Sequence, residues 1–278
     1  MRIPTIIAAL LLFGSACLAA EDREDSHPFM SDTFFIDVGM YFPAREIALS
    51  VNGPIRGAQQ QDIDFESEFG LKKSDETFAL NLGWRFGEKW QLGAQFFESD
   101  GQRSRTLDED VEWGEYVFGA GTGVRAGMDF SMIRTFFARR FESAAEHHEF
   151  GIGAGLHWLE IGAFIEGNAI LNGVQAGFRR ESVSAAAPLP NIGGWYTRSL
   201  SKNWVFKARF DWLSADVGDY DGRLINASAG FNYRLSQNFG LGVSYNLFEL
   251  DVGVDKKGWR GDVELSYQGV FVHASAFW

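Results

Sequence analysis

The feature that most limits how this chain can fold is a strict alternation of apolar and polar residues along several long runs. In the run from 204 to 212 every even-numbered residue is apolar, and the positions between them include Lys207 and Asp211. The same period recurs over 77–86 and 239–247. A period of two belongs to a β-strand whose two faces meet different surroundings. The sequence therefore predicts an all-β protein.

Alternation alone does not identify what the apolar face meets. In a soluble sandwich this face forms the core, whereas in a membrane barrel it faces lipid and the polar face lines the lumen. A soluble β-barrel in the periplasm or outside the cell is one alternative, and it would need helices or a second sheet over its aromatic face. Three further features favour the membrane: an export signal, the spacing of aromatic residues and the final strand.

The N-terminus has the pattern of a secretory signal peptide. An apolar segment over residues 6–13 is followed by small residues and, after Ala20, by a charged run. We expect cleavage after Ala20, which divides the chain into a signal peptide (1–20) and a β-barrel domain (21–278). An uncleaved N-terminal anchor and lipoprotein processing at Cys17 are the alternatives.

Aromatic residues recur eight positions apart on one strand face. Trp204 and Trp212 are one such pair, and Phe150 and Trp158 are another. Eight residues span about 26 Å along a strand, or roughly 20 Å across a membrane at a tilt of ~40°. This length is close to that of an apolar band with an aromatic girdle at each edge.

The chain ends in a run that alternates up to its last residue, Trp278. This run resembles the terminal strand of bacterial outer-membrane β-barrel proteins, and the resemblance is one of pattern over the whole chain after the signal peptide. It implies the cell outer membrane as the location, with outer-membrane lipid and lipopolysaccharide as surroundings. It also implies that barrel-assembly machinery recognises Phe277 and Trp278.

Short polar turns alternate with longer connections along the chain, and barrels of this class have short periplasmic turns and longer outer loops. The short turns lie near 87–89, 142–147, 201–203 and 236–238, and the longer connections near 54–61, 105–121, 167–188, 216–222 and 254–258. We therefore predict a transmembrane, antiparallel, up-and-down barrel of ten strands with both termini in the periplasm. The predicted strands are 34–52, 63–86, 90–105, 122–141, 148–166, 189–200, 203–215, 222–235, 239–253 and 258–278.

Several predicted strands are about twice the length that a membrane crossing needs, so we expect long extracellular strand extensions. Asn52-Gly53 and Asp221-Gly222 fit hairpin turns at that end. The alternation changes phase at 267–269, which a one-residue bulge explains. A turn there would instead give twelve strands.

The polar faces of the predicted strands place charged and histidine side chains in the lumen. The candidate lumen-lining residues are Asp37, Arg85, His157, Lys207, Arg209, Asp211, Arg234 and His273. A barrel of about ten strands is close to the size at which side chains fill the interior. A buried network of paired charges is the main interpretation. The alternative is a narrow pore with a slight preference for anions, because basic residues outnumber acidic ones in this set.

An outer-membrane enzyme that modifies lipid A or peptides at the outer rim is the alternative function. Omptin proteases are similar in having ten long strands, and lipid A deacylases use His and Ser. Here Glu160 is three residues from His157 and so on the opposite strand face, and no His lies in the acidic outer segments. We therefore expect no catalytic residues, no enzymatic activity and no cofactor. The predicted function is non-enzymatic, as a narrow channel or as a structural or surface-binding element.

The charge of the chain limits its partners. The formal net charge of −12 argues against nucleic-acid binding, which needs a basic face. Acidic outer segments, such as 108–112 and 216–221, could offer oxygen ligands to divalent cations. Cations that bridge these segments to lipopolysaccharide phosphates are the expected form of such binding, and the sequence singles out no particular ligands.

Overall fold

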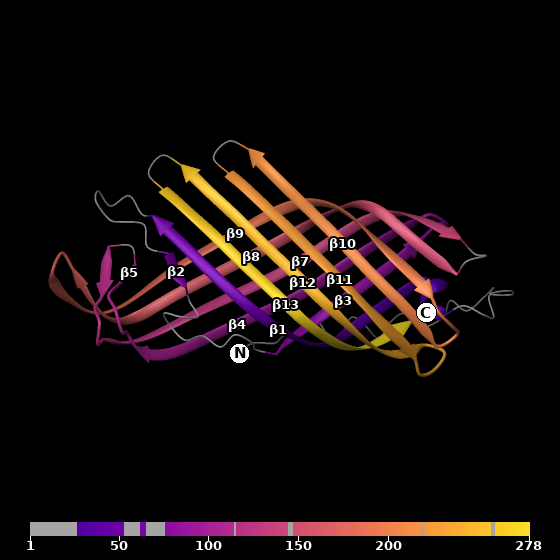
Figure 1. Cartoon of the computed structure of the whole chain (residues 1–278), viewed down its shortest axis with the longest axis horizontal. Helices are drawn as coiled ribbons and strands as arrows, with labels where there is room; N and C mark the ends of the chain where they lie inside the picture. The colour runs from indigo at the N-terminus through magenta and orange to yellow at the C-terminus, as the bar shows by residue number, and fades with distance from the viewer. Residues whose placement is uncertain are drawn as a thin grey trace.

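The computed structural model is a closed antiparallel β-barrel (Figure 1). It describes residues 27–52, 62–64, 76–113, 115–143, 147–217, 220–256 and 259–278, so the predicted signal peptide lies outside the described residues. The elements are η2 (Pro28–Met30), β1 (Phe34–Asn52), β2 (Asp62–Asp64), β3 (Thr77–Phe86), β4 (Trp90–Thr106), β5 (Val111–Trp113), β6 (Tyr116–Phe118), β7 (Gly123–Ser143), β8 (His148–Leu171), β9 (Val174–Ser199), β10 (Trp204–Val217), β11 (Tyr220–Arg234), β12 (Phe239–Lys256) and β13 (Trp259–Phe277).

Ten of these strands form the barrel wall. They pair in the order β1-β3-β4-β7-β8-β9-β10-β11-β12-β13, and β13 pairs with β1 to close the ring. The predicted ten-stranded antiparallel barrel is therefore confirmed. β2 and β5 lie at the end of the barrel opposite the C-terminus, which is the expected outer end (Figure 1). Among the described residues, no helix is long and apolar enough to cross a membrane.

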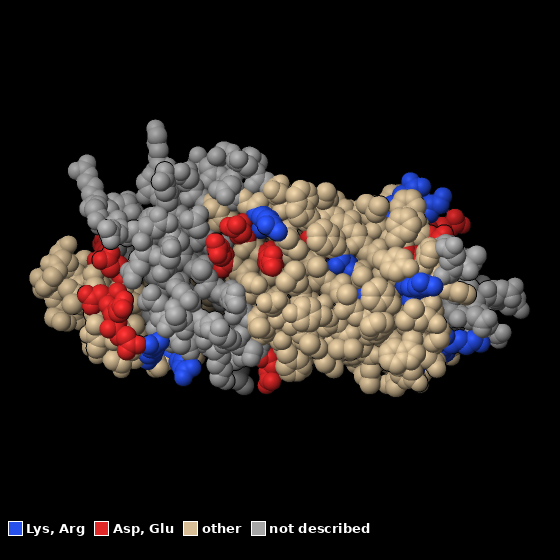
Figure 2. All heavy atoms as spheres, in the orientation of Figure 1, with Lys and Arg blue, Asp and Glu red and all other residues tan. Residues whose placement is uncertain are grey.

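The apolar face of the wall strands points outward. Trp204 and Trp212 are 46% and 41% exposed, and Phe150 and Trp158 are exposed on the same outer surface. In Figure 2 charged side chains lie on the left-hand half of the face and at its right-hand end, and the stretch between the centre and the right-hand end is largely uncharged. The alternation thus produces an outer apolar belt, as a barrel in lipid requires.

The connection predicted at 167–188 is instead part of a tall hairpin. β8 and β9 remain paired within this predicted loop, up to a tight turn at Asn172-Gly173. The φ angles of these two residues are 51° and 76°. Asn-Gly is the preferred pair for a turn that needs positive φ at both central residues. The sequence prediction missed this turn because the flanking segments do not alternate cleanly.

The hairpin turn predicted at Asp221-Gly222 is wrong. Both residues lie within β11, where Asp221 pairs with Asp216 and Gly222 pairs with Ala215. Because β11 begins at Tyr220, Asp221 and Gly222 are both strand residues. Of the other predicted turn, Asn52 ends β1 and Gly53 lies outside the described residues.

The bulge predicted at 267–269 is also absent. β13 pairs with both β1 and β12 in continuous register through this segment. Leu265 and Tyr267 point into the barrel, where they are 2% and 1% exposed. The barrel interior becomes apolar from this point toward the outer end. The apolar residues of β13 therefore change from the outward to the inward face without any shift of the backbone.

The loop predicted at 105–121 folds into a small hairpin of β5 and β6. Val111, Trp113 and Phe118 from this segment are buried in the same apolar cluster as the barrel interior. Asp110 Oδ1 accepts a hydrogen bond of 2.7 Å from the Ala120 amide. Acidic side chains of this segment thus take part in local structure at the outer end.

Candidate functional site

The predicted lumen residues lie in the periplasmic half of the barrel interior, with one at its edge. Asp37, His157, Asp211 and His273 are buried, as is Arg85. Lys207 and Arg209 keep side-chain exposures of 22% and 16%. Arg234 is at the periplasmic rim and donates through Nε to the Ser236 carbonyl, 3.1 Å away. The structure therefore brings seven of the eight residues into the interior proper and leaves Arg234 at the mouth.

One cluster centres on Asp211 of β10. Arg134 of β7 donates two hydrogen bonds to its carboxylate, at 2.5 Å from Nε and 2.7 Å from the terminal nitrogen. Arg209 Nε is 3.7 Å from the same carboxylate, and its terminal nitrogen donates to Asn226 Oδ1 at 3.1 Å. Asn226 Nδ2 in turn lies 3.0 Å from His157 Nε2. His157 is thus hydrogen-bonded to an amide rather than to a carboxylate.

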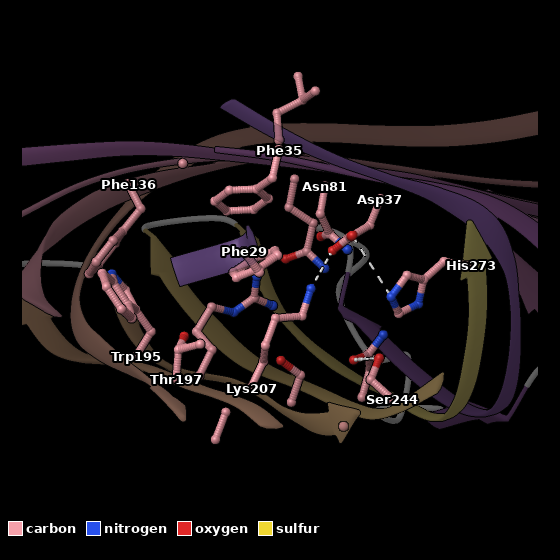
Figure 3. Close-up of a pocket in the computed structure, with 18 of the residues that line it drawn as sticks. Phe29, Phe35, Asp37, Asn81, Phe136, Trp195, Thr197, Lys207, Ser244 and His273 are labelled. Carbon is pink, nitrogen blue, oxygen red and sulfur yellow. Dashed lines mark hydrogen bonds and ion pairs between the residues drawn. The ribbon is translucent and has the colours of Figure 1, made fainter. Parts of the chain in front are cut away.

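A second cluster centres on Asp37 of β1 (Figure 3). Its carboxylate accepts 2.7 Å and 2.5 Å hydrogen bonds from Lys207 Nζ and Ser275 Oγ. His273 Nε2 lies 3.8 Å from Asp37 Oδ1, and the His273 ring stacks on Phe271 at 4.7 Å. Both carboxylate oxygens of Asp37 thus accept a hydrogen bond, and a buried ion pair is tolerated when such additional hydrogen bonds are present.

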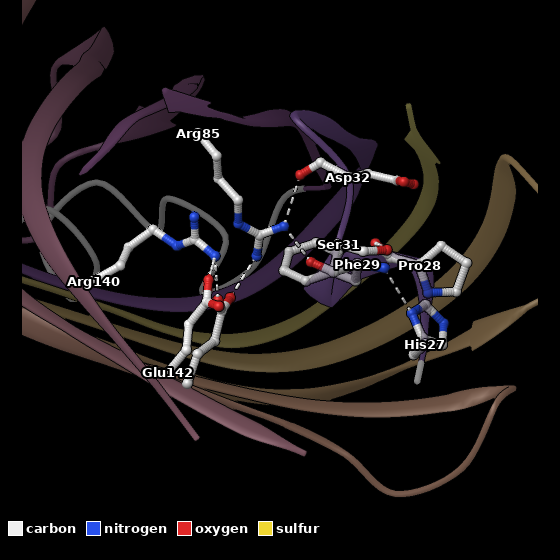
Figure 4. Close-up of polar contacts among 9 residues, drawn as sticks. His27, Pro28, Phe29, Ser31, Asp32, Arg85, Arg140 and Glu142 are labelled. Atoms are coloured by element: carbon white, nitrogen blue, oxygen red, sulfur yellow. Dashed lines mark hydrogen bonds and ion pairs between the residues drawn. The ribbon is translucent and has the colours of Figure 1, made fainter. Parts of the chain in front are cut away.

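A third cluster joins the wall to the segment before β1 (Figure 4). Arg85 of β3 pairs with Glu149 of β8 at 2.5 Å, and Arg140 of β7 pairs with the same carboxylate at 2.8 Å. The other side of the Arg85 guanidinium donates to the carbonyl oxygens of Phe29 and Asp32. Arg85 therefore clamps the turn η2 inside the periplasmic mouth of the barrel.

The segment His27–Asp32, which we call the plug, closes this mouth. The His27 amide donates to Ser199 Oγ at 2.9 Å, and its ring meets Phe277 edge-on at 5.5 Å between centroids. Phe29 packs under Lys207, whose Nζ is 4.2 Å from the ring centroid. Cation–π and apolar contacts thus add to the backbone clamp of the plug.

The plug carries two titratable groups with shifted pKa values. Burial, together with the charges of Lys207 and Arg234, lowers the pKa of His27 to about 4. Burial raises the pKa of Asp32 to about 6, although Arg85 and Arg234 oppose the shift. Near neutral pH the seated plug therefore holds a neutral imidazole.

A cavity of about 120 Å³ remains between the plug and the middle of the barrel. Its lining includes four cationic side chains, the carboxylate of Asp37 and several neutral polar groups. The cationic residues are Arg85, Arg134, Lys207 and Arg209. Figure 3 shows Phe29, Trp195 and Lys207 around this space. The cavity is a polar chamber that the plug separates from the periplasm.

An aromatic layer covers the polar chamber on its outer side. Phe130 lies 5.2 Å from Tyr267, 5.4 Å from Phe97 and 5.6 Å from Phe248, measured between ring centroids. All four rings are at most 3% exposed. This layer continues outward into the apolar cluster under β5 and β6. Among the described residues, buried apolar side chains therefore occupy the interior on the outer side of the chamber.

Sequence reasoning missed three charged members of these clusters: Arg134, Arg140 and Glu149. On β7 both strand faces carry apolar residues, so the alternation does not identify the inward face. Arg134 and Arg140 are both even-numbered and so share one face of β7, which could have indicated that this face is the inward one. Glu149 follows a short turn, where a charged residue ordinarily indicates a solvent-exposed side chain.

No protein-family model and no curated protein matches the sequence. The structure is similar to that of the outer membrane protease OmpT from Escherichia coli, with a TM-score of 0.57 and 10% identity over 89% of this chain and 97% of that chain. OprG from Pseudomonas aeruginosa has a TM-score of 0.34 and 12% identity, over 89% of this chain and 96% of that chain. The fold is that of a bacterial outer-membrane β-barrel. This fold and the apolar belt are consistent with the cell outer membrane.

Proposed function

We propose that this chain is a non-enzymatic outer-membrane barrel with a closed interior, which acts as a structural and surface-binding element. The observation that carries the proposal is the aromatic layer of Phe97, Phe130, Phe248 and Tyr267. A permeant ion would have to cross this layer after passing the plug and the paired charges. Apolar constrictions exclude water and ions, so the arrangement favours a closed barrel over the narrow pore.

The surroundings of the histidines support a non-enzymatic role. Acid–base catalysis needs a His within hydrogen-bond reach of its partner and of a substrate. His157 contacts an amide, lies beneath Phe248 and is fully buried. His27 belongs to the plug, and His273 lies beside Asp37 near the periplasmic end. The likeness to a protease is one of fold at 10% identity, and it supplies no catalytic group here.

We further propose lipopolysaccharide as the partner of the outer strand extensions. Asp100 of β4 and Asp129 of β7 are directly paired across the strands and project from the wall. Like charges at such a position repel each other, and a divalent cation shared with a lipopolysaccharide phosphate would relieve the repulsion. Among the described residues no group of three His, Cys, Asp or Glu could hold a metal ion, so the phosphate would have to complete the coordination.

The last two residues suit recognition during assembly. Phe277 is buried against the plug, whereas Trp278 is 45% exposed and stacks on Phe34 at 5.9 Å. Before the barrel closes, both rings would be free to contact the barrel-assembly machinery. We propose that the barrel-assembly machinery contacts both residues.

Conductance in a planar bilayer tests the closed barrel. Refolded protein, checked for heat-modifiable migration on a gel, should give no steady openings at moderate voltage. Steady openings with an anion preference would overturn the proposal, provided that Lys207→Gln or Arg209→Gln removes the preference. Arg139→Gln is the matched control, because Arg139 is exposed on the outer face of β7 and has the same charge.

A further inference from the structure

The wall of the barrel is incompletely paired between β9 and β10. The register of these two strands ends at Ile192 and Trp212. Beyond this point β10 continues to Val217 and pairs with β11, and β9 continues to Val174 and pairs with β8. Among the described residues, the outer part of β9 therefore has one edge within the β8–β9 hairpin and a second edge with no strand beside it.

Two prolines explain where this pairing ends. The Leu200 amide donates toward β10 and the Ser199 amide toward β8, so even-numbered residues of β9 face β10. The alternation is unbroken, because β9 pairs with β8 one residue to one from 177 to 198. Pro188 and Pro190 are at even positions and have no N–H. The ladder with β10 therefore loses a donor at both positions, while the ladder with β8 keeps its own.

Outward from the prolines, the unpaired edge of β9 offers regularly spaced backbone groups. Ser182, Ser184 and Ala186 turn their N–H and C=O groups to this edge, at intervals of roughly 7 Å. Their side chains are small, uncharged and exposed. Proteins usually protect such an edge with charges or prolines, and residues 182–187 contain neither. The backbone of an extended polypeptide has donors and acceptors at the same interval, so it is the ligand that this edge matches.

The outer end of this edge favours an acidic partner. The Arg180 side chain is 52% exposed and pairs with Glu166 at 2.8 Å, and Arg125 pairs with the other oxygen of the same carboxylate at 2.5 Å. Two cations thus share one anion and leave a net positive charge on the outer face. A strand added beside β9 would place a side chain next to Arg180, where an acidic residue pairs favourably.

A second copy of this chain fits the edge less well. Two copies in one membrane have the same orientation, so their β9 edges run in the same direction. Pairing between them would be parallel, which is slightly less stable per residue than antiparallel pairing. An extended segment of a different protein has no such constraint.

We propose that the edge of β9 from Phe178 to Ala186 binds an extended segment of another protein, which adds to the wall as an antiparallel strand. The segment exchanges backbone hydrogen bonds with Ser182, Ser184 and Ala186, and it places an acidic side chain beside Arg180. This inference rests on the surface-binding role proposed above and names the class of partner. It does not depend on the closed interior, which bilayer conductance tests separately.

Amide hydrogen exchange of the refolded full barrel, followed by NMR, tests the site. The probe is a synthetic peptide with the sequence of residues 161–168, because this segment of β8 already pairs antiparallel with β9. In the barrel alone the amides of Ser182 and Ser184 should exchange rapidly, and those of Glu181 and Val183, which face β8, should exchange slowly. Saturating peptide should slow exchange at Ser182 and Ser184 by about tenfold or more and leave Glu181 and Val183 unchanged.

Modified peptides separate backbone pairing from side-chain contact. One peptide carries N-methyl groups on alternate residues, and a second carries them on the residues between. Only one set of peptide amides faces β9, so one peptide should lose the protection and the other should keep it. Replacing the glutamate of the peptide with glutamine should weaken binding severalfold, as should Arg180→Gln in the barrel.

Variants of the edge assign the effect to its backbone. Ser184→Pro removes one N–H from the edge and keeps the pairing with β8, because this N–H points away from β8. Protection at Ser182 should then be lost, whereas the matched control Ser184→Ala should bind the peptide as the wild type does. If Ser184→Pro fails to refold, the two methylated peptides still decide the assignment.

Several results would overturn the inference. Slow exchange at Ser182 and Ser184 in the barrel alone would show that the edge is already covered, and slow exchange that disappears on dilution would identify a second copy as its occupant. Rapid exchange that the peptide leaves unchanged, or equal protection by both methylated peptides, would exclude strand addition. Steady openings in a bilayer together with peptide protection would overturn only the closed barrel.

Discussion

The periplasmic half of the barrel interior is held by ion pairs, whereas its outer half is held by aromatic and aliphatic side chains. Below, Asp37, Glu149 and Asp211 each bind basic residues from other strands. Above, Phe130 and Tyr267 belong to an apolar cluster that reaches the β5–β6 hairpin.

The outer surfaces of the two halves differ in the opposite sense. Around the ion pairs the outer face carries apolar residues such as Phe137 and Trp212, whereas near the level of Phe130 it carries exposed carboxylates such as Asp129 and Glu249. The difference teaches that the two strand faces exchange polarity along the barrel: polar side chains lie inside where the outer face is apolar, and apolar side chains lie inside where the outer face is charged.

The largest expected effect comes from removing a carboxylate of the lower half. Asp211→Asn leaves Arg134 and Arg209 without a counter-ion, so we expect a loss of roughly 3 to 5 kcal/mol in the free energy of unfolding. Urea titration of the refolded barrel measures it. Asp100→Asn, on the outer surface, is the matched control and should lose nothing. Equal losses in the two variants would contradict the distinction between buried and exposed carboxylates.

The upper half should respond to lost volume instead of lost charge. Phe130→Ala removes a ring that contacts three other buried rings, and we expect a loss of about 3 kcal/mol or slightly more. The same titration with Phe137→Ala is the control, because Phe137 faces lipid and is 47% exposed. A smaller loss at Phe130 than at Phe137 would mean that the aromatic layer does not act as a packed core.

The plug should respond to pH through two opposing groups. The lowered pKa of His27 means that the unfolded state binds the proton more readily, so its contribution is lost as pH falls from about 6.5 toward 4. The raised pKa of Asp32 has the reverse sign, and its contribution is lost as pH rises through about 6. In wild type the two effects partly cancel between pH 7 and 5.

Asp32→Asn separates these effects. In this variant we expect acidification from pH 7 to 5 to release the plug, with a change on the order of 1 to 3 kcal/mol. Protease cleavage near Ser31 measures release. Adding His27→Asn should remove the pH dependence. A pH response that persists in the double variant would show that another group controls the plug.

The smallest effect is expected at Arg180, whose side chain is 52% exposed. Glu166 on the outer face of β8 pairs with Arg125 at 2.5 Å and with Arg180 at 2.8 Å. Arg180→Gln should lose less than about 1 kcal/mol, and the loss should shrink further in high salt. A loss as large as that of Asp211→Asn would show that ion pairs on the outer face and in the interior stabilise the barrel equally.

The barrel wall could be predicted from the sequence, because each wall strand has to satisfy lipid on one face. The ten strands, their pairing order and the outward aromatic pairs follow from that single requirement. The interior could not be predicted to the same extent, because no solvent fixes its polarity. Tyr267 suggested a bulge only because an inward residue was expected to be polar, and Arg134 was missed because both faces of β7 are apolar.

The contacts of the plug have a consequence for the order of folding events. His27 contacts Ser199 on β9 and Phe277 on β13, while Arg85 on β3 holds the carbonyls. These three strands are separated around the ring, and the docking site exists only once the first and last strands have met. The plug therefore docks only after the barrel has closed. Its insertion marks a barrel whose assembly is complete, so protection of this segment from proteases distinguishes a finished molecule from one still open at its seam.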